Sequence, residues 1–328
     1  MSLAEGARFS DLLVLRRVGR GGMGEVYLVR NEKLDRLEAL KVLRGDPEPD
    51  LVARFRGEAR IGGRLHHPCI VSVYDLVDVD GQLGLRMEYV DGPDLRALVK
   101  EKGAMPPEEV ARAVRDLADA LDAAHRAGVL HRDVKPANVL LPPAGGGRHA
   151  VLGDFGIGLL EGSARLTRTG FLGTVAYTAP ERLESGSAGS AADLYSLACT
   201  AFEALTGRPP YVADTDHAVV LAHLEAPPPT PRDVVGTLPA AVDPVFATAL
   251  AKDPARRPGS CTAFARALSA SLGVAHAGAS ASAPAPASAP GGASAPGAPS
   301  PVARSSTPPV GPTYSPAGGE KREGTRLL

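Results

Sequence analysis

The sequence predicts an α+β protein with a small strand-rich part, a larger helical part and a disordered C-terminal tail. Residues 12–43 and 70–90 carry short runs rich in Val, Leu and Ile between turn residues, which is typical of strands. From Pro93 to residue 272 apolar residues recur at helical spacing instead. Of the last 54 residues, 275–328, 39 are Ala, Pro, Ser or Gly, so too little apolar surface is available to offset the entropy of folding.

Three strands are expected within residues 12–43 and two within residues 70–90. The first three segments read LLVLRRV, EVYLVR and RLEALKVL, and the other two read IVSVYDLVD and GLRMEYV. A turn at Asp80-Gly81 separates the last two. Between the two groups, residues 50–65 show the apolar spacing of a helix.

Two longer helices are predicted in the second part. The segment PPEE at 106–109 places proline and acid at a helix start, and apolar residues then follow at helical spacing from Val110 until Gly128 stops the helix. Residues 193–205, DLYSLACTAFEAL, are almost entirely apolar or small, which predicts a buried central helix that ends before Gly207. Shorter helical patterns follow at 240–251 and 260–272.

Overall charge and size limit the class of protein. The chain has 328 residues, with 36 Lys and Arg against 37 Asp and Glu, a formal net charge of −1. This balance argues against a protein that coats nucleic acid or an anionic membrane. The foldable part, about 265 residues, has about the size of one domain with two lobes.

Cysteine usage and the N-terminus indicate the compartment. Cys69, Cys199 and Cys261 are widely spaced and form no C-x-x-C pair, so buried free thiols in a reducing compartment are expected. The first residues lack the pattern of a signal peptide, and no run of about 18 apolar residues occurs. We therefore expect a cytoplasmic protein without a membrane span.

A glycine cluster follows the first strand, where Gly19, Gly21 and Gly24 form G-x-G-x-x-G. A dinucleotide-binding loop needs a helix after it, but the next residues, EVYLV, predict a strand. The cluster therefore indicates a glycine-rich hairpin whose backbone amides cover nucleotide phosphates, with Val26 packing against an adenine. A plain hairpin turn is the alternative for the motif taken alone.

Lys41 lies in an apolar strand, where an ammonium group is costly unless it is paired. Glu58, in the first predicted helix, is a suitable partner. Each residue alone could be a surface charge, but their joint spacing after the glycine cluster favours a pair. Gly62 and Gly63 weaken the helix that carries Glu58, so we expect this pair to form only in an active state.

Three further motifs follow in order: HRDVKPAN at 131–138, DFG at 154–156 and APE at 179–181. Together with the glycine cluster and Lys41, they resemble the signature elements of eukaryotic-like protein kinases. The surrounding sequence most resembles the PknB-like group of bacterial Ser/Thr kinases, over residues 9–272. The resemblance implies a bilobal protein-kinase fold with an N-terminal arm (1–10), a kinase domain (11–272) made of an N-lobe (11–90) and a C-lobe (93–272), and a tail (273–328).

The resemblance also implies a reaction: transfer of the γ-phosphoryl group of ATP to Ser or Thr hydroxyls of proteins, with Mg²⁺, or Mn²⁺ in its place. Asp133 would accept the proton of the substrate hydroxyl, and Lys135 would hold the γ-phosphate. Lys41, held by Glu58, would grip the α- and β-phosphates. The implied metal ligands are Asn138 and Asp154.

Around the nucleotide, the resemblance implies a gatekeeper and two adenine-binding backbone groups. The residues of this set are Gly19, Arg20, Gly21, Gly22, Met23, Gly24, Val26, Ala39, Met87 (the gatekeeper), Glu88 and Val90 (the backbone groups). His131 is expected to brace the catalytic loop as a structural core residue.

Regulation by autophosphorylation is a further implication. Arg132 would pair with a phosphorylated activation loop that contains Thr167, Thr169 and Thr174. We expect phosphate at Thr167 and Thr169 and a substrate-pocket role for Thr174. A homodimer would allow the reaction to occur in trans.

Three other residues are expected to have structural roles. Glu181 and Arg257 match a family ion pair, and Asp193 matches an acid that binds the catalytic-loop backbone. Two alternatives to an active kinase are a catalytically silent scaffold and a small-molecule phosphotransferase. The intact catalytic set argues against the first alternative, and Lys135 together with the APE segment argues against the second.

Overall fold

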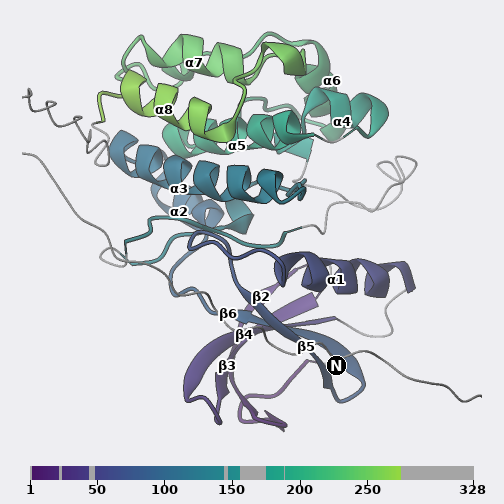
Figure 1. Cartoon of the computed structure of the whole chain (residues 1–328). Helices are drawn as coiled ribbons and strands as arrows, with labels where there is room; N and C mark the ends of the chain where they lie inside the picture. The colour runs from purple at the N-terminus through teal and green to yellow at the C-terminus, as the bar shows by residue number, and fades with distance from the viewer. Residues whose placement is uncertain are drawn as a thin grey trace, which may run out of the picture. The chain divides into compact units, whose positions relative to one another are not determined.

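The computed structural model describes residues 2–21, 24–43, 49–143, 147–155, 175–187 and 189–274 (Figure 1). Most of the predicted tail, from residue 275 on, lies outside the described residues. So do the predicted site residues Gly22 and Met23 and the three activation-loop threonines, Thr167, Thr169 and Thr174.

The first part of the chain forms a six-stranded antiparallel sheet with the order β1-β2-β3-β4-β6-β5. Five strands match the expected segments. The sixth, β1, was not expected: it is two residues long and pairs Phe9 with Leu12 across a turn in which Ser10 has a positive φ of 55°. The strands are β1 (Arg8–Phe9), β2 (Leu12–Arg20), β3 (Gly24–Asn31), β4 (Arg36–Leu43), β5 (Val73–Val79) and β6 (Gln82–Glu88).

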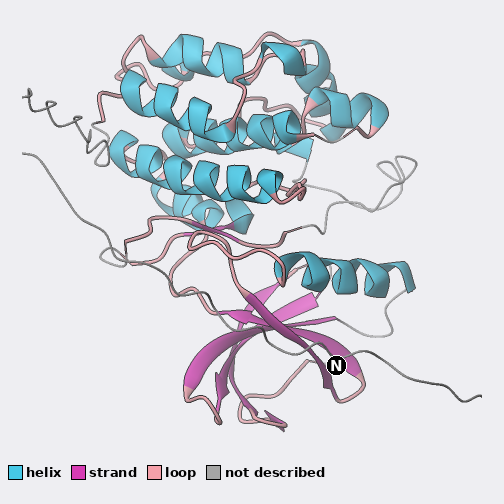
Figure 2. Ribbon diagram, in the orientation of Figure 1, coloured by secondary structure: helices cyan, strands magenta, loops and turns pink. Residues whose placement is uncertain are grey.

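One helix, α1 (Pro49–Gly62), accompanies this sheet, and the other described α-helices form the second lobe (Figure 2). The predicted helices at 106–128, 193–205, 240–251 and 260–272 are confirmed, whereas α2, α4 and α6 were not individually predicted. The α-helices of the second lobe are α2 (Leu95–Lys102), α3 (Pro107–Arg126), α4 (Pro180–Ser185), α5 (Ser190–Thr206), α6 (Asp216–Glu225), α7 (Val242–Ala249) and α8 (Cys261–Ser271).

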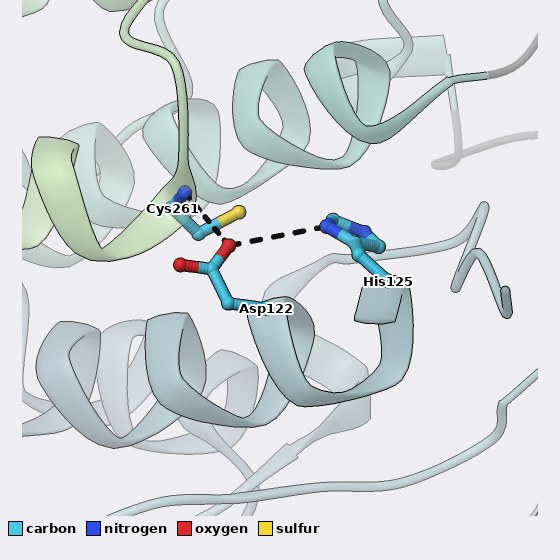
Figure 3. Close-up of side chains that lie close together, drawn as sticks. All are labelled: Asp122, His125 and Cys261. Atoms are coloured by element: carbon cyan, nitrogen blue, oxygen red, sulfur yellow. Dashed lines mark hydrogen bonds and ion pairs between the residues drawn. The ribbon is translucent and has the colours of Figure 1, made fainter. Parts of the chain in front are cut away.

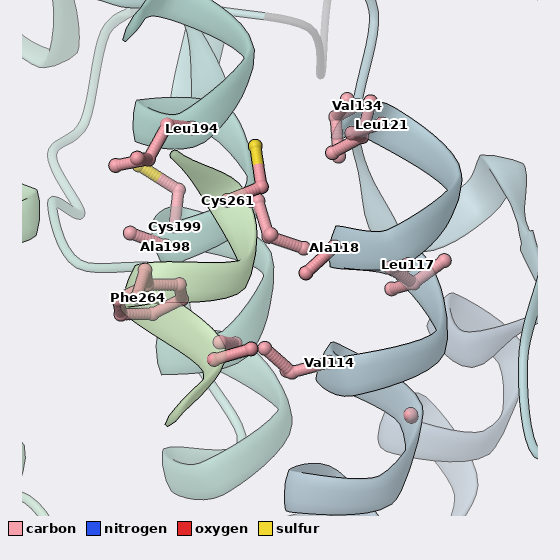
Figure 4. Packing of buried hydrophobic residues seen from close by; sticks show 14 of the residues in the cluster. Val114, Leu117, Ala118, Leu121, Val134, Leu194, Ala198, Cys199, Cys261 and Phe264 are labelled. Carbon is pink, nitrogen blue, oxygen red and sulfur yellow. The ribbon is translucent and has the colours of Figure 1, made fainter. Parts of the chain in front are cut away.

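The core of the helical lobe lies between α3, α5 and α8 (Figure 4). Every residue of α5 from Ala192 to Thr206 is buried, as its apolar sequence predicts. On α3, the face that includes Val114 and Leu121 is buried against this helix and α8. The α+β fold with a strand-rich first lobe and a helical second lobe is therefore confirmed.

Asp122 joins α3 to the first turn of α8. Its Oδ1 accepts a hydrogen bond from the backbone N of Cys261 at 3.0 Å, and its Oδ2 accepts from the backbone N and Oγ1 of Thr262 at 3.0 and 2.7 Å. Nδ1 of His125 lies 3.9 Å from the same Oδ1 (Figure 3). Asp122, His125 and Cys261 contain potential metal-binding atoms, but a carboxylate at a helix N-terminus is favourable by itself, and this accounts for the cluster.

The two lobes are connected by backbone pairing near a two-stranded sheet, β7 (Val139–Leu140) and β8 (Val151–Leu152). The backbone N of Val71 donates to the carbonyl of Leu152 at 2.9 Å, and the N of Leu152 donates to the carbonyl of Cys69 at 2.9 Å. Cys69 is buried and unpaired, like Cys199 and Cys261, which confirms the prediction of free thiols.

Candidate active site

The glycine-rich hairpin is formed by β2 and β3. Val26 on β3 lies opposite Gly19 on one side and Lys41 on the other. Gly24 allows the strands to approach closely, since a Cβ there would lie 2.3 Å from the carbonyl oxygen of Val42. Only glycine fits this position, so β3 and β4 can pair closely at the end of the hairpin.

Lys41 forms ion pairs with carboxylates from both lobes. Its Nζ lies 3.2 Å from Oε1 of Glu58 on α1 and 2.9 Å from Oδ1 of Asp154. Although burial alone would lower the pKa of Lys41, the two carboxylates raise it above its usual value. Likewise, burial would raise the pKa of Asp154, but Lys41 lowers it. Lys41 is therefore charged, and the predicted pair with Glu58 is formed in this structure.

His131 connects the loop before Asp133 to the DFG segment. Its Nδ1 accepts from the backbone N of Asp133 at 3.2 Å, so the ring is protonated at Nε2, which donates to the carbonyl of Gly153 at 2.9 Å. Its ring packs edge-on against Phe155 with centroids 4.5 Å apart. His131 is fully buried, so it braces the loop without facing a substrate.

Among the described residues, hydrogen bonds hold one oxygen of the Asp133 carboxylate. Its Oδ2 accepts from Nζ of Lys135 at 2.7 Å and from Nδ2 of Asn138 at 3.1 Å. Nδ2 of Asn138 also donates to the backbone carbonyl of Asp133 at 2.8 Å. The other oxygen, Oδ1, is buried and has no hydrogen-bond partner among the described residues.

Asp193 at the start of α5 fixes the backbone just before Asp133. Its Oδ2 accepts from the backbone N of His131 at 2.9 Å, and its Oδ1 accepts from the backbone N of Arg132 at 2.7 Å. Nε2 of His125 lies 2.8 Å from the same Oδ2. Burial would raise the pKa of Asp193, but the hydrogen bond from His125 lowers it, so the ionised carboxylate holds the loop. Arg132 takes a positive φ of 67° in this tight turn.

The segment after β6 connects the lobes. Met87 lies opposite Ala39 in the sheet, and Val90 is buried against Val71. The backbone N of Glu88 donates to the carbonyl of Ser72 at 2.8 Å.

The side chain of Glu88 binds a residue that the sequence did not single out. Oε1 of Glu88 lies 2.5 Å from Nη2 of Arg148, in the loop before β8, and Nη1 of Arg148 donates to the carbonyl of Pro68 at 2.9 Å. Arg148 lies outside every motif that indicates a function in this sequence, so nothing predicted its contact with Glu88.

The APE segment is fixed by a bidentate ion pair. Nη1 and Nη2 of Arg257 each lie 2.8 Å from an oxygen of Glu181, and the side chain of Arg257 is fully buried. Nη1 of Arg182 donates to the carbonyl of Arg132, which links α4 to the catalytic loop. The predicted ion pair between Glu181 and Arg257 is therefore present. It is linked to the catalytic loop through Arg182, which follows Glu181 and contacts the backbone of the residue before Asp133.

Comparison with known proteins identifies the family of this chain. The sequence matches the protein kinase domain over residues 12–268. The chain belongs to the protein kinase family. It is 46% identical over 280 residues to serine/threonine-protein kinase PknF of Mycobacterium tuberculosis, covering 83% of this chain and 59% of PknF.

Two other proteins named as serine/threonine-protein kinases are similar in sequence to this chain. Identity to PknJ of Mycobacterium bovis is 45% over 276 residues, covering 82% of this chain and 47% of PknJ. Identity to PknD of Mycobacterium tuberculosis is 43% over 256 residues, covering 77% and 38% of the two chains. This chain therefore spans at most 59% of the length of these relatives. Within the described residues, no helix of the kinase has the length and apolar character needed to cross a bilayer.

Protein kinase domains use ATP and a divalent metal ion, and the side chains present fit both. Nδ2 of Asn138 donates to Asp133, so Oδ1 is the atom that Asn138 can offer to a cation. Asp154 adds an ionised carboxylate, and carboxylate and amide oxygens are the ligands that Mg²⁺ prefers. Lys41, beside Asp154, supplies the positive charge that phosphates require.

Proposed function

We propose that this kinase transfers the γ-phosphoryl group of Mg-ATP to Ser and Thr hydroxyls of proteins. The proposal depends above all on the hydrogen bonding of the Asp133 carboxylate. One of its oxygens is held by Lys135 and Asn138, and the other is buried without a partner among the described residues. A buried carboxylate oxygen without a donor is ready to accept the hydrogen of an incoming hydroxyl.

The proposed reaction follows from these positions. The substrate hydroxyl donates to Oδ1 of Asp133, its oxygen attacks the γ-phosphorus, and the bond from that phosphorus to the β,γ-bridging oxygen breaks, releasing ADP. The proton passes to Asp133. Lys135, held against Asp133, lies where it can neutralise charge on the transferred group.

The remaining site residues would position the nucleotide. Asn138 and Asp154 would hold the divalent cation, which neutralises phosphate charge when bound, and Lys41 would hold the α- and β-phosphates with Glu58 as its support. Gly19, Arg20, Gly21 and Gly24 would cover the phosphates. Val26, Ala39 and Met87 would enclose the adenine, which the backbone of Glu88 and Val90 would bind.

Autophosphorylation in trans, between two copies of the chain, is part of this proposal. The buried free thiols support a location in a reducing compartment, the cytoplasm. The similarity to kinases whose names specify serine and threonine supports the choice of acceptor.

Labelled ATP with Mg²⁺ and a generic basic protein substrate tests the function. Wild type should label Ser and Thr residues, and Asp133→Asn should lower kcat at least about 100-fold, the scale of general-base catalysis. Asp214→Asn, at an exposed position, is the matched control and should retain wild-type activity. Equal labelling by wild type and Asp133→Asn would contradict the mechanism, and no labelling by either would favour a scaffold.

A further inference from the structure

The last turn of α1 packs directly against the first residue of β5. Gly62 ends α1 and is buried, and Val73 begins β5. Residues four apart lie on the same face of a helix. Gly62 therefore occupies the same face as Glu58, one turn further along.

No side chain fits at Gly62 with α1 in this place. A Cβ added there would lie 2.4 Å from Cγ2 and 3.1 Å from Cβ of Val73. Val73 cannot easily move away, because valine has few accessible rotamers and its backbone is paired with Met87 in the sheet. Val73 thus occupies the space that a side chain at position 62 would take.

The surrounding space offers no alternative. The cavity beside Gly62, which Glu58, Val73 and Phe155 help to line, has a volume of about 10 Å³. That is about the room that a single water needs. A side chain at position 62 would therefore have to push α1 away from β5.

The ion pair between Lys41 and Glu58, one helical turn away, cannot be kept if α1 shifts in this way. Nζ of Lys41 lies 3.2 and 3.5 Å from the two oxygens of Glu58, already at the long end of the hydrogen-bonding range. Both residues are buried, so water cannot readily replace a lost contact. A displacement of α1 on the order of 1 Å would break the pair.

We propose that Gly62 is a positioning residue: its missing side chain lets α1 approach Val73 closely enough for Glu58 to reach Lys41. Glycine has a low helix propensity. The close contact with Val73 explains why glycine is nevertheless suited to position 62. The catalytic consequence rests on the proposed function, whereas the geometric one does not.

Four variants test the proposal: Gly62→Ala, Val73→Ala, the double variant, and Gly63→Ala. Alanine favours helix more than glycine does, so a loss in Gly62→Ala cannot come from helix propensity. We expect Gly62→Ala to lower kcat/KM for ATP by about 10- to 100-fold, the cost of a displacement on the order of 1 Å. The double variant should return to within about threefold of Val73→Ala, because the contact with Cγ2 is removed and the remaining 3.1 Å contact needs only a small shift.

Gly63→Ala is the matched control. Gly63 is exposed, and a Cβ there would meet only the carbonyl oxygen of Ala59, one turn back, at 3.1 Å, so this variant should keep wild-type kinetics. Wild-type kinetics in Gly62→Ala, with wild type itself active, would overturn the proposal.

Crystal structures of the same variants separate this proposal from the proposed function. In Gly62→Ala the distance from Nζ of Lys41 to the nearer oxygen of Glu58 should exceed 4.0 Å, the limit for an ion pair, and it should recover in the double variant. If wild type has no kinase activity but these distances behave as stated, the proposed function fails and the positioning role stands. If the distance is unchanged in Gly62→Ala, the positioning role fails whatever the activity.

Discussion

Nζ of Lys41 lies 2.9 Å from Oδ1 of Asp154, so a lysine of the sheet and an aspartate of the helical lobe form an ion pair between the lobes. The same ammonium binds Glu58, which places one cation between two carboxylates. In the proposed reaction Lys41 holds phosphates and Asp154 holds a cation. Nucleotide binding therefore has to exchange the Lys41–Asp154 contact for contacts with the ligand.

Lys41→Met should abolish this arrangement. It leaves Glu58 and Asp154 close together without a counter-charge, and it removes the proposed ligand of the α- and β-phosphates. We expect kcat/KM to fall at least about 100-fold, the usual scale for losing a charge that stabilises the transition state. Steady-state kinetics measure this, and circular dichroism verifies that the variant is folded. Activity within about threefold of wild type would contradict the assigned role.

Asp193→Asn should lower kcat more than it changes KM for ATP. Asparagine keeps one acceptor oxygen but presents an NH₂ group to a backbone N–H of the catalytic loop, so one buried hydrogen bond is lost. The expected loss in the free energy of unfolding is about 1–3 kcal/mol, the cost of an unsatisfied buried group. Denaturant unfolding and kinetics measure both effects. A variant in which only KM rises would show that Asp193 does not act through the loop that carries Asp133.

Arg148→Ala should weaken nucleotide binding without slowing the chemical step. Arg148 binds the carboxylate of Glu88 and the carbonyl of Pro68, so it fixes the segment whose backbone is proposed to bind adenine. We expect KM for ATP to rise about three- to tenfold, on the order of 1 kcal/mol for a partly exposed pair, with kcat little changed. Arg148→Lys should recover part of the affinity, because it keeps the charge but not both hydrogen bonds. A fall in kcat at unchanged KM would contradict this role.

Local sequence predicted much of the fold and of the candidate site. Asp133, Lys135 and Asn138 lie within six residues of one another, so one turn of backbone brings their side chains together. The long apolar segment at 193–205 could only be a buried helix. These predictions succeeded because a motif or a periodicity contains the whole contact, whereas the distant pair Glu181–Arg257 was predicted from the family resemblance.

Contacts that depend on strand register or on loop paths could not be predicted. Nε of Arg86 on β6 lies 2.9 Å from Oε2 of Glu38 on β4, because the register of these two strands brings the side chains together. Nη2 of Arg86 also lies 3.6 Å from Oδ2 of Asp11. The contact of Gly62 with Val73 likewise exists only after α1 has packed on β5. β1 is too short for any periodicity to reveal it.

Arg257→Ala should destabilise the helical lobe. The buried guanidinium holds both oxygens of Glu181 and also donates to the backbone carbonyls of Ala251, Lys252 and Ala191. Removing it leaves these acceptors without donors, and breaking a buried ion pair costs about 3–5 kcal/mol. Arg257→Lys should recover little, because one ammonium cannot replace the planar, bidentate group. Thermal unfolding measures both variants, and a loss below about 1 kcal/mol in Arg257→Ala would contradict the structural role.

Activity should depend on pH through the side chain of Glu58. Burial raises the pKa of Glu58 to about 7, against the opposing effect of the Lys41 charge. Protonated Glu58 carries no charge to pair with Lys41, so kcat/KM for ATP should fall about tenfold for each pH unit below 7. Glu58→Gln mimics the protonated form, so this less active variant should not show the fall in kcat/KM below pH 7. Because the ionisation of ATP affects both proteins equally, the ratio of their profiles isolates Glu58.

Stability should change in the opposite direction. The pKa of Glu58 is higher in the folded chain than the 4.5 of a free glutamate, so folding favours the protonated form. Its contribution to stability is therefore fully present below about pH 4.5 and is lost as the pH rises through about 7. The free energy of unfolding of wild type, relative to Glu58→Gln, should thus decrease from pH 5 to pH 8 while relative activity increases. If the free energy of unfolding and the activity both increased with pH, the ionised pair of Glu58 and Lys41 would stabilise the fold. That result would contradict the prediction, in which the ionised pair serves nucleotide binding and lowers stability.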